Sequence, residues 1–332
     1  MKHGSNIYKY AKKLECTTEE IIDFSSNINL HQPTQILTLD SSLVSRYADS
    51  SYKELKEVIA SNYSIDANQI ALYNGATVAI YELLKSLKRK DVFLYAPLYG
   101  EYEKACTLTK KNIYRINRIT DETTQPTDDS VVVFVNPSTP EGSYTDISSL
   151  LEMWMEKECV IIIDESFLEF EDLKSCREEI NNYKKLYIVQ SFSKFYSCAG
   201  VRIGAIFSHK KSIKKLKQPL WNLSSFDVTF LKGRLVDAAF KTQTRELHKQ
   251  QKRELEDILE KSELFDEIVE SNANFILTYS PRGEELFKHL LTHKILTRKC
   301  GSFNYLSNNW LRFAVKETSS HALLSKALSE FV

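Results

Sequence analysis

Short runs of apolar, mostly β-branched residues recur along the first part of the chain and alternate with longer amphipathic segments. Runs of this length are typical of strands buried on both faces, and the segments between them have the apolar spacing of helices. The alternation predicts an α/β fold with a mostly parallel sheet between helical layers. The expected strands are 70–73, 92–95, 131–135, 160–163, 186–190 and 202–207, and the expected helices include 52–62, 76–87 and 146–157.

The pattern changes after about Lys211, where polar helical segments alternate with only a few strands. A chain of 332 residues exceeds the usual size of one hydrophobic core, so a second domain is expected. We predict a large domain at 36–225 and a smaller α+β domain formed by 1–35 and 226–332. Its expected elements are helices at 245–261 and 282–292, strands at 275–279 and 311–315, and a closing helix.

Charge and cysteine content exclude several classes of protein. Lys and Arg total 44 and Asp and Glu total 44, so no global charge attracts nucleic acid or an anionic membrane, and an anionic ligand needs a local cluster of donors. The longest apolar runs are too short to span a bilayer, and the N-terminus does not resemble a signal peptide. Six scattered cysteines without a C-x-x-C pair suit a reducing compartment. We expect a cytoplasmic protein with free thiols and no nucleic-acid or membrane partner.

The most informative stretch is Ser191-Phe192-Ser193-Lys194, which follows an expected strand and precedes Gly200-Val201-Arg202-Ile203-Gly204. A lysine in this position can form a Schiff base with pyridoxal 5'-phosphate (PLP). The hydroxyls of Ser191 and Ser193 and the planar guanidinium of Arg202 would then bind the phosphate of that cofactor. Lys194 is therefore the predicted cofactor-bearing residue.

Other expected strand ends carry residues that suit the same cofactor. Asp164 follows 160–163, where a buried carboxylate can keep the pyridine nitrogen protonated, and Asn136 follows 131–135 and would aim its amide at the phenolic oxygen or the substrate. Gly75 and Ala76 form a turn at a helix start, which is an anion site, and Tyr99 would stack on the ring. Ligands of parallel sheets lie beyond the carboxyl ends of the strands, so these residues are expected to converge.

Each of these residues has an ordinary alternative when taken alone. Asp164 fits a helix N-cap, Asn136 a turn residue and Gly75 a loop glycine. Their joint occurrence at successive strand ends indicates a cofactor site. His289 and His293 lie four apart on an expected helix, but they lack an H-E-x-x-H motif and a third ligand, so no metal site is predicted.

The two motifs S-x-S-K…G-x-R-x-G and N-P-x-x-P-x-G resemble those of the fold-type I PLP-dependent enzymes, the aspartate aminotransferase superfamily. Within it, the chain is similar to the histidinol-phosphate aminotransferase branch and above all to the L-threonine-O-3-phosphate decarboxylases of cobalamin biosynthesis. Three features carry the second resemblance. The first is His3-Gly4-Ser5-Asn6-Ile7 with Asp23-Phe24-Ser25-Ser26-Asn27-Ile28-Asn29, and the second is Asp164-Glu165-Ser166-Phe167, with Phe where the aminotransferases usually have Tyr. The third is Leu296-Thr297-Arg298-Lys299-Cys300-Gly301-Ser302-Phe303 followed by Leu311-Arg312-Phe313-Ala314-Val315.

The resemblance also implies roles for individual residues. Arg298 and Arg312 would bind the anionic ends of the substrate. Tyr47 would reach the cofactor phosphate of a partner subunit, which implies a homodimer with shared active sites. The remaining substrate-binding residues implied are His3, Gly4, Asn27 and Asn136. Ser5 and Lys299 depart from the family's pattern, in which a glycine and an aspartate occupy these positions.

The function implied is decarboxylation of a phosphorylated hydroxy-amino acid, O-phospho-L-threonine or O-phospho-L-serine, to an amino-alcohol phosphate used in cobamide biosynthesis. The alternative is an aminotransferase of the histidinol-phosphate type, because both reactions use the same cofactor site and arginines. A third interpretation is a catalytically inert PLP fold that senses a ligand or binds a partner. A pocket separates substrates that differ by one methyl group by only about 1–3 kcal/mol, and no residue here identifies which of the two phospho-amino acids is preferred.

Overall fold

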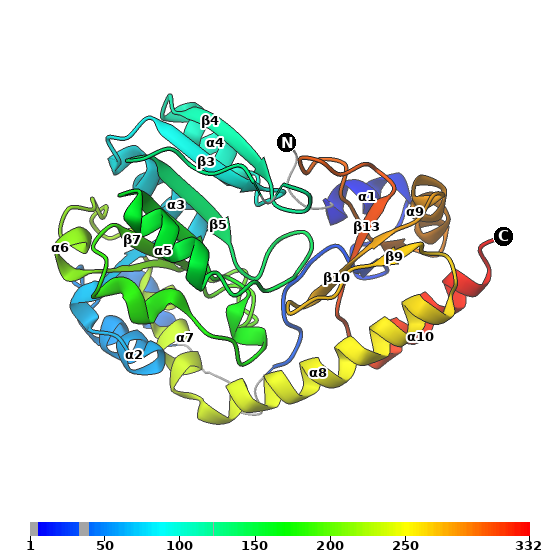
Figure 1. The fold of residues 1–332 in the computed structure, drawn as a ribbon. Helices are drawn as coiled ribbons and strands as arrows, with labels where there is room; N and C mark the ends of the chain where they lie inside the picture. Colours follow the sequence, from blue (N-terminus) through cyan, green and yellow to red (C-terminus); the bar gives the residue numbers. More distant parts are fainter. Residues whose placement is uncertain (1–5, 33–39, 122) are drawn as a thin grey trace.

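The computed structural model describes residues 6–32, 40–121 and 123–332, which form a large and a small domain lying side by side (Figure 1). The large domain contains a seven-stranded sheet in the order β2-β8-β7-β6-β5-β3-β4. All neighbouring strands are parallel except β8, which runs antiparallel to both β2 and β7. The prediction of a mostly parallel sheet is confirmed. The strands are β2 (Ile70–Tyr73), β3 (Asp91–Ala96), β4 (Asn112–Asn117), β5 (Val131–Val135), β6 (Val160–Asp164), β7 (Leu186–Ser191) and β8 (Gly204–Ser208).

Helices cover both faces of this sheet because its strands are apolar on both sides. In β5, Val131, Val133 and Val135 pack into one core cluster, and Val132 and Phe134 pack into the other, as the two-residue period of a strand requires. One face is covered by α2 (Lys53–Tyr63), α5 (Ser148–Glu156) and α7 (Ser225–Val236), and the other by α3 (Gly75–Ser86), α4 (Glu101–Leu108) and α6 (Lys210–Ile213).

The small domain is built on a four-stranded antiparallel sheet in the order β12-β13-β10-β9, and a separate parallel pair joins β1 to β11. The pairing of β1 with β11 confirms that the N-terminal segment packs on the C-terminal domain. The elements are α1 (Ile7–Lys13), β1 (Ile22–Asp23), α8 (Ala238–Lys261), β9 (Glu267–Ile268), β10 (Phe275–Tyr279), α9 (Gly283–Thr292), β11 (Ile295–Leu296), β12 (Arg298–Lys299), β13 (Trp310–Ala314) and α10 (Thr318–Ser329).

The boundary between the domains lies later than predicted. Residue 225 is the first residue of α7, whose buried Leu231 and Leu235 pack into the core of the large domain. Helix α7 therefore belongs to the large domain, and the long α8 connects the two domains along the base of the molecule (Figure 1). No helix among the described residues is both long and apolar enough to cross a membrane.

Several elements begin or end elsewhere than the sequence pattern indicated. The strand expected at 202–207 begins only at Gly204, which leaves Arg202 in the preceding turn. Strand β4 and helix α4 were not expected: β4 is an edge strand that is mostly exposed, and α4 is only eight residues long. Each gives a weak periodic signal.

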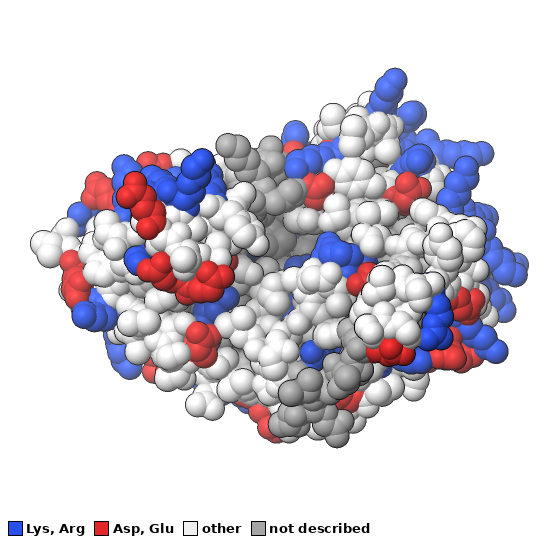
Figure 2. Space-filling view, turned by 180° about the vertical axis from the view of Figure 1, so that it is seen from behind, with Lys and Arg blue, Asp and Glu red and all other residues white. Residues whose placement is uncertain are grey.

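The carboxyl ends of β5, β6 and β7 face a hollow between the domains. Figure 2 shows this hollow from behind, with Lys and Arg side chains beside it. The hollow is therefore where cationic groups of this electrically neutral chain can meet an anionic ligand.

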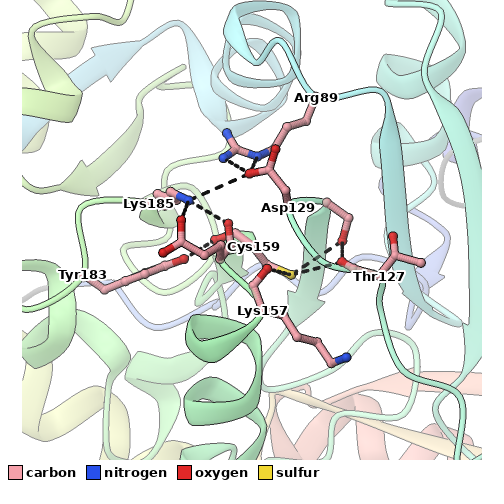
Figure 3. Close-up of polar contacts among 9 residues, drawn as sticks. Arg89, Thr127, Asp129, Lys157, Cys159, Tyr183 and Lys185 are labelled. Carbon is pink, nitrogen blue, oxygen red and sulfur yellow. Dashed lines mark hydrogen bonds and ion pairs between the residues drawn. The ribbon is translucent and has the colours of Figure 1, made fainter.

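At the opposite end of the sheet, where β5, β6 and β7 begin, polar contacts join the segments that precede these strands (Figure 3). Arg89 Nε donates to Asp129 Oδ1 at 2.9 Å, and Lys185 Nζ bonds to Glu158 at 2.7 Å. Tyr183 donates its hydroxyl to the carbonyl of Cys159 at 2.6 Å, and that cysteine is fully buried. These contacts hold the amino ends of β5, β6 and β7 together, away from the hollow.

Candidate active site

A cavity of about 490 Å³ lies between the domains. The large domain contributes the residues after β3, β5, β6 and β7 together with the start of α3, and the small domain contributes residues 23–28 and the β12–β13 region. Most of the residues predicted for the cofactor and the substrate are among its walls, namely Asn27, Ala76, Tyr99, Asp164, Ser191, Ser193, Lys194, Arg202, Arg298 and Arg312.

Lys194 lies in the turn that follows β7 and lines the cavity. Its Nζ is 4.7 Å from the centre of the Phe167 ring. Burial lowers the pKa of Lys194, and the nearby cations Arg312 and Arg202 lower it further, while Asp164 acts in the opposite direction. A lysine with a lowered pKa has a larger fraction of neutral amine at neutral pH, and only the neutral amine can attack a carbonyl carbon.

Asp164 is the last residue of β6 and is buried. Its Oδ2 accepts a hydrogen bond from the Tyr102 hydroxyl at 2.8 Å, and its Oδ1 accepts one from the Ser166 amide at 3.0 Å. Burial raises the pKa of Tyr102 well above its usual value, and the adjacent Asp164 raises it further, so this tyrosine stays a donor. The carboxylate is thus held in place at the cavity wall, where a cationic ring nitrogen would find its partner.

An anion cradle surrounds the start of α3. Gly75 has a φ of +83°, which turns the chain into the helix, and Arg202 Nη1 donates to Ser193 Oγ at 3.2 Å. A Cβ at Gly75 would come within 2.8 Å of Arg202 Nη2, and one at Gly204 would lie 2.2 Å from the Ala76 nitrogen. The glycines therefore allow the arginine, the serine hydroxyls and the helix amides to converge, which suits a phosphate dianion.

Tyr99 lines the cavity beside this cradle. Its hydroxyl lies 3.2 Å from Thr77 Oγ1 on the first turn of α3. Burial raises the pKa of Tyr99, which keeps the phenol neutral at physiological pH. The contact of its ring with a planar cofactor stays a prediction.

The structure gives Asn136 a different role from the predicted one. Its Nδ2 donates to the carbonyl of Thr145 at 2.8 Å and its Oδ1 accepts from the Thr145 amide at 3.0 Å. The side chain thereby closes the turn after β5 and does not line the cavity. Thr139, three residues later in the same turn, lines the cavity instead and accepts a hydrogen bond from Arg312 Nη1 at 3.2 Å.

Arg298 and Arg312 form the small-domain wall of the cavity. They are direct partners across the antiparallel pair β12–β13, so their side chains project from the same face of the sheet. Arg298 Nη2 donates to Ser302 Oγ at 2.8 Å, and Arg312 Nη2 donates to the Ser25 carbonyl at 3.3 Å. Burial, together with the neighbouring Arg298, lowers the pKa of Arg312 to about 10, which leaves it charged at neutral pH.

Of the other residues predicted to bind the substrate or a partner subunit, only Asn27 lies at the cavity among the described residues. Asn27 lines the cavity next to Ser25 and Ser26. His3 and Gly4 lie outside the described residues. Tyr47 does not line this chain's cavity: it is 80% exposed, and its ring stacks on Trp221 at 4.8 Å. Its contact with a partner subunit stays a prediction.

The remaining candidate groups lie outside the cavity. The rings of His289 and His293 are 4.7 Å apart, and His289 Nε2 contacts the Ala327 carbonyl at 2.8 Å. Among the described residues, no cluster of three side chains of the metal-binding types occurs. The six cysteines carry free thiols.

Sequence reasoning missed Tyr102, Thr139 and Phe303 as neighbours of the site. Tyr102 lies in the first turn of α4, and Tyr99 lies just before this helix in the loop after β3. Thr139 lies within the turn motif that was recognised, but the motif alone does not say which of its polar residues faces inward.

The fold and the cavity define the class of protein: a fold-type I enzyme whose donors and lysine suit PLP, which supplies an electron sink for substrate amines when it is bound. The chain belongs to the aminotransferase class I and II family, whose model matches residues 1–331.

Similar curated proteins include both candidate activities. The adenosylcobalamin biosynthesis bifunctional protein CobDQ of Leptospira interrogans is 29% identical and matches 99% of this chain, which spans only 41% of that longer protein. The threonine-phosphate decarboxylase of Salmonella typhimurium is 23% identical over 98% of this chain and 95% of its own length. The histidinol-phosphate aminotransferase of Francisella philomiragia is 26% identical over 88% and 85%, respectively.

Solved structures agree on the fold. The histidinol-phosphate aminotransferase of Clostridium acetobutylicum superposes with a TM-score of 0.81 at 27% identity, covering 93% of this chain and 98% of that one. The enzyme of the same name from Sinorhizobium meliloti, solved in complex with pyridoxal-5'-phosphate, gives a TM-score of 0.82 at 16% identity and covers 98% and 94%.

Proposed function

We propose that this chain is a PLP-dependent decarboxylase of a phosphorylated hydroxy-amino acid, either O-phospho-L-threonine or O-phospho-L-serine. The products would be carbon dioxide and an amino-alcohol phosphate, a building block for cobamide biosynthesis. In this proposal Lys194 binds the cofactor covalently, Asp164 holds its ring nitrogen, and the cradle of Gly75, Ser193 and Arg202 holds its phosphate.

The observation that carries the proposal is the pair formed by Arg298 and Arg312. The buried guanidinium of Arg312 and the half-buried guanidinium of Arg298 lie on one face of a two-stranded ribbon and repel each other, and an anion in the cavity would offset this repulsion. Arg312 Nε is also buried without a hydrogen-bond partner among the described residues, so one donor remains for a ligand. An amino acid that carries both a carboxylate and a phosphate supplies two anionic groups for the two arginines.

The chain's own residues determine which bond of the substrate breaks. The cofactor, when bound, would supply the electron sink, and the residues that fix the orientation of the substrate's α-carbon would decide which of its bonds breaks. Arg298 and Arg312 would fix the two anionic ends, and therefore the rotation of the α-carbon between them. Lys194 Nζ, with its lowered pKa, would carry the proton that replaces the carboxylate at that carbon.

The cavity wall near Lys194 is apolar on the side of Phe167. Phe167 is 3% exposed and packs edge-on against Phe275 with ring centres 5.0 Å apart. Its ring places an apolar surface beside the amine where the aminotransferase branch carries a tyrosine hydroxyl. The absence of that hydroxyl supports decarboxylation over transamination.

The similar proteins include both activities at comparable identity, so the comparisons do not separate the two candidates. The relative named threonine-phosphate decarboxylase matches 98% of this chain, whereas the relative named histidinol-phosphate aminotransferase matches 88% of it. The aminotransferase remains the second candidate, because a solved enzyme of that name superposes on almost the whole chain at 27% identity.

The test is an assay of purified protein loaded with PLP and given O-phospho-L-threonine and O-phospho-L-serine in parallel. We expect release of carbon dioxide from at least one substrate, and the ratio of the two kcat/KM values identifies the preferred one. Transfer of the amino group to 2-oxoglutarate is measured in the same samples. Absence of carbon dioxide with both substrates, together with amino transfer, would establish the aminotransferase instead.

A further inference from the structure

Residues 25–29 form a segment that runs from the substrate side of the cavity to the turn that carries Lys194; we refer to it as the strap. Residues 25–28 line the cavity. Three consecutive carbonyls of the strap are held by side chains of the small domain. Ser25 accepts from Arg312 at 3.3 Å, Ser26 from Lys316 Nζ at 3.0 Å, and Asn27 from Asn274 Nδ2 at 2.8 Å.

The last residue of the strap, Asn29, contacts the large domain. Its main-chain N–H donates to the carbonyl of Lys194 at 3.0 Å, and its Nδ2 donates to the carbonyl of Phe195 at 2.8 Å. The same Nδ2 lies 3.4 Å from Thr244 Oγ1 on α8. Asn29 therefore joins the strap, the Lys194 turn and the helix that connects the domains.

If Asn29 were lost, the carbonyl of Phe195 would have few other hydrogen-bond donors within reach. Phe195 is 1% exposed and packs against Phe170 and Phe240, so water has little access to its peptide group. A buried carbonyl that loses its donor remains unsatisfied, and the backbone has to move to find another donor. A movement of this turn displaces the Cα of Lys194, and with it the reacting nitrogen.

We propose that Asn29 is a positioning residue that holds the Lys194 turn in register with the substrate side of the cavity. This inference rests on the proposed role of Lys194. Arg312 bonds to Ser25, the first residue of the strap, and Asn29, its last residue, bonds to the Lys194 carbonyl. A ligand that engages Arg312 is therefore coupled to the backbone of Lys194 through the five residues of the strap. The side-chain amide of Asn29, more than its place in the chain, provides this coupling.

Asn29 also has a purely local role that the test has to separate. Its Oδ1 accepts from the His31 amide at 3.0 Å, an Asx turn that an aspartate would form equally well. Asn29→Asp keeps this turn and the main-chain bond to Lys194, but replaces the donor to Phe195 with a carboxylate oxygen that repels the carbonyl. Asn29→Ala removes all three side-chain contacts, to Phe195, Thr244 and His31.

Asn309 offers a matched control away from the cavity. Its Nδ2 donates to the Pro281 carbonyl at 3.1 Å and its Oδ1 accepts from the Glu284 amide at 3.3 Å. Asn309→Ala therefore removes the same kinds of contact as Asn29→Ala, but within the small domain only.

The experiment measures amide hydrogen exchange of residues 192–198, before and after loading with PLP, and then kcat and KM on the substrate with the highest turnover. For both Asn29→Asp and Asn29→Ala we expect faster exchange of this peptide in both states and a kcat lowered about tenfold with nearly unchanged KM. Asn309→Ala should match the wild type in both measurements.

Wild-type exchange and kcat in Asn29→Asp would overturn the inference, because the asparagine would then serve only its local turn. A wild-type cofactor absorption band that survives Lys194→Ala would contradict the role of Lys194 itself, and the inference would fall with it. The two failures are distinguishable, because the first leaves the cofactor band dependent on Lys194.

Discussion

Arg312 is a buried cation with no carboxylate within ion-pair distance among the described residues. Its Nη1 donates to the Thr139 hydroxyl and its Nη2 donates to the Ser25 carbonyl, and both acceptors are uncharged. Keeping such a charge buried costs free energy in the absence of a ligand, and this cost is offset when an anion binds. In the proposed function, Arg312 would therefore link substrate recognition to stability at a single position.

Arg312→Gln should lower kcat/KM roughly a hundredfold, which corresponds to the loss of about 3 kcal/mol of charge-assisted contact with the substrate. The visible absorption band of the bound cofactor should remain, because the cradle around α3 is untouched. Arg282→Gln is the control, since Arg282 is exposed and pairs with Glu285 at 2.8 Å. Unchanged kcat/KM in Arg312→Gln would remove this arginine from the substrate site.

At this scale the sequence predicted residues whose chemistry is tied to a strand end. Lys194 and Asp164 follow buried apolar runs, so their direction follows from the sheet. Asn136 also follows such a run, but its amide bonds to Thr145, because the turn needs a side chain to satisfy its own backbone. Which polar residue of a turn closes it and which one faces the cavity depends on backbone dihedrals that the residue pattern does not determine.

Among the elements, the approach of β8 to α3 is the tightest contact that forms the site. Gly204 pairs with Tyr73 and Ser191 on the two neighbouring strands and faces the first turn of α3. The distance between the helix amides and Arg202 is set by this contact. The packing of β8 against α3 therefore determines where the anion cradle lies, and the side chains that bind the anion follow from it.

Gly204→Ala should push α3 away from β8, because the new Cβ would lie 2.2 Å from the Ala76 nitrogen. We expect unfolding to cost about 1–3 kcal/mol less free energy and the affinity for PLP to fall at least about tenfold. Denaturation and cofactor titration measure the two effects. Gly200→Ala is the matched control, since a Cβ there meets no atom within 4 Å. Equal affinity in the two variants would show that the contact does not shape the cradle.

The elements that the sequence failed to predict are those whose stability comes from their neighbours. Strand β4 has polar, exposed positions and is held by its backbone pairing with β3. Helix α8 begins at Ala238, seven residues before the expected start, because the Asp237 cap and the buried Phe240 and Thr244 fix its first turns. Long, continuously apolar strands such as β5 and β6 were predicted within one residue.

On the scale of the whole molecule, one apolar patch is exposed next to the η1 segment (Ser41–Ser45) of the large domain. Its members Val44, Tyr47, Leu220 and Trp221 are between 49% and 80% exposed. Ser225 Oγ donates to the Arg46 carbonyl at 2.6 Å and so holds the two parts of the patch together. Exposed apolar patches of this kind often mark interfaces, and the proposed homodimer would cover it.

Sedimentation should therefore give twice the mass of the chain. Trp221→Glu should shift the protein towards the monomer and weaken cofactor binding, if Tyr47 reaches the neighbouring site. Leu323→Glu is the control, because Leu323 is 51% exposed on α10, remote from the patch. A wild-type monomer that binds PLP fully would contradict both the dimer and the role of Tyr47.

The central claim is that the substrate loses its α-carboxylate and keeps its α-hydrogen. The most direct measurement uses O-phospho-L-threonine with deuterium at the α-carbon, followed by mass spectrometry of the amine product. Our account predicts an aminopropanol phosphate that retains the deuterium and has gained one proton from solvent. Loss of the deuterium, with formation of the corresponding oxo acid, would contradict it.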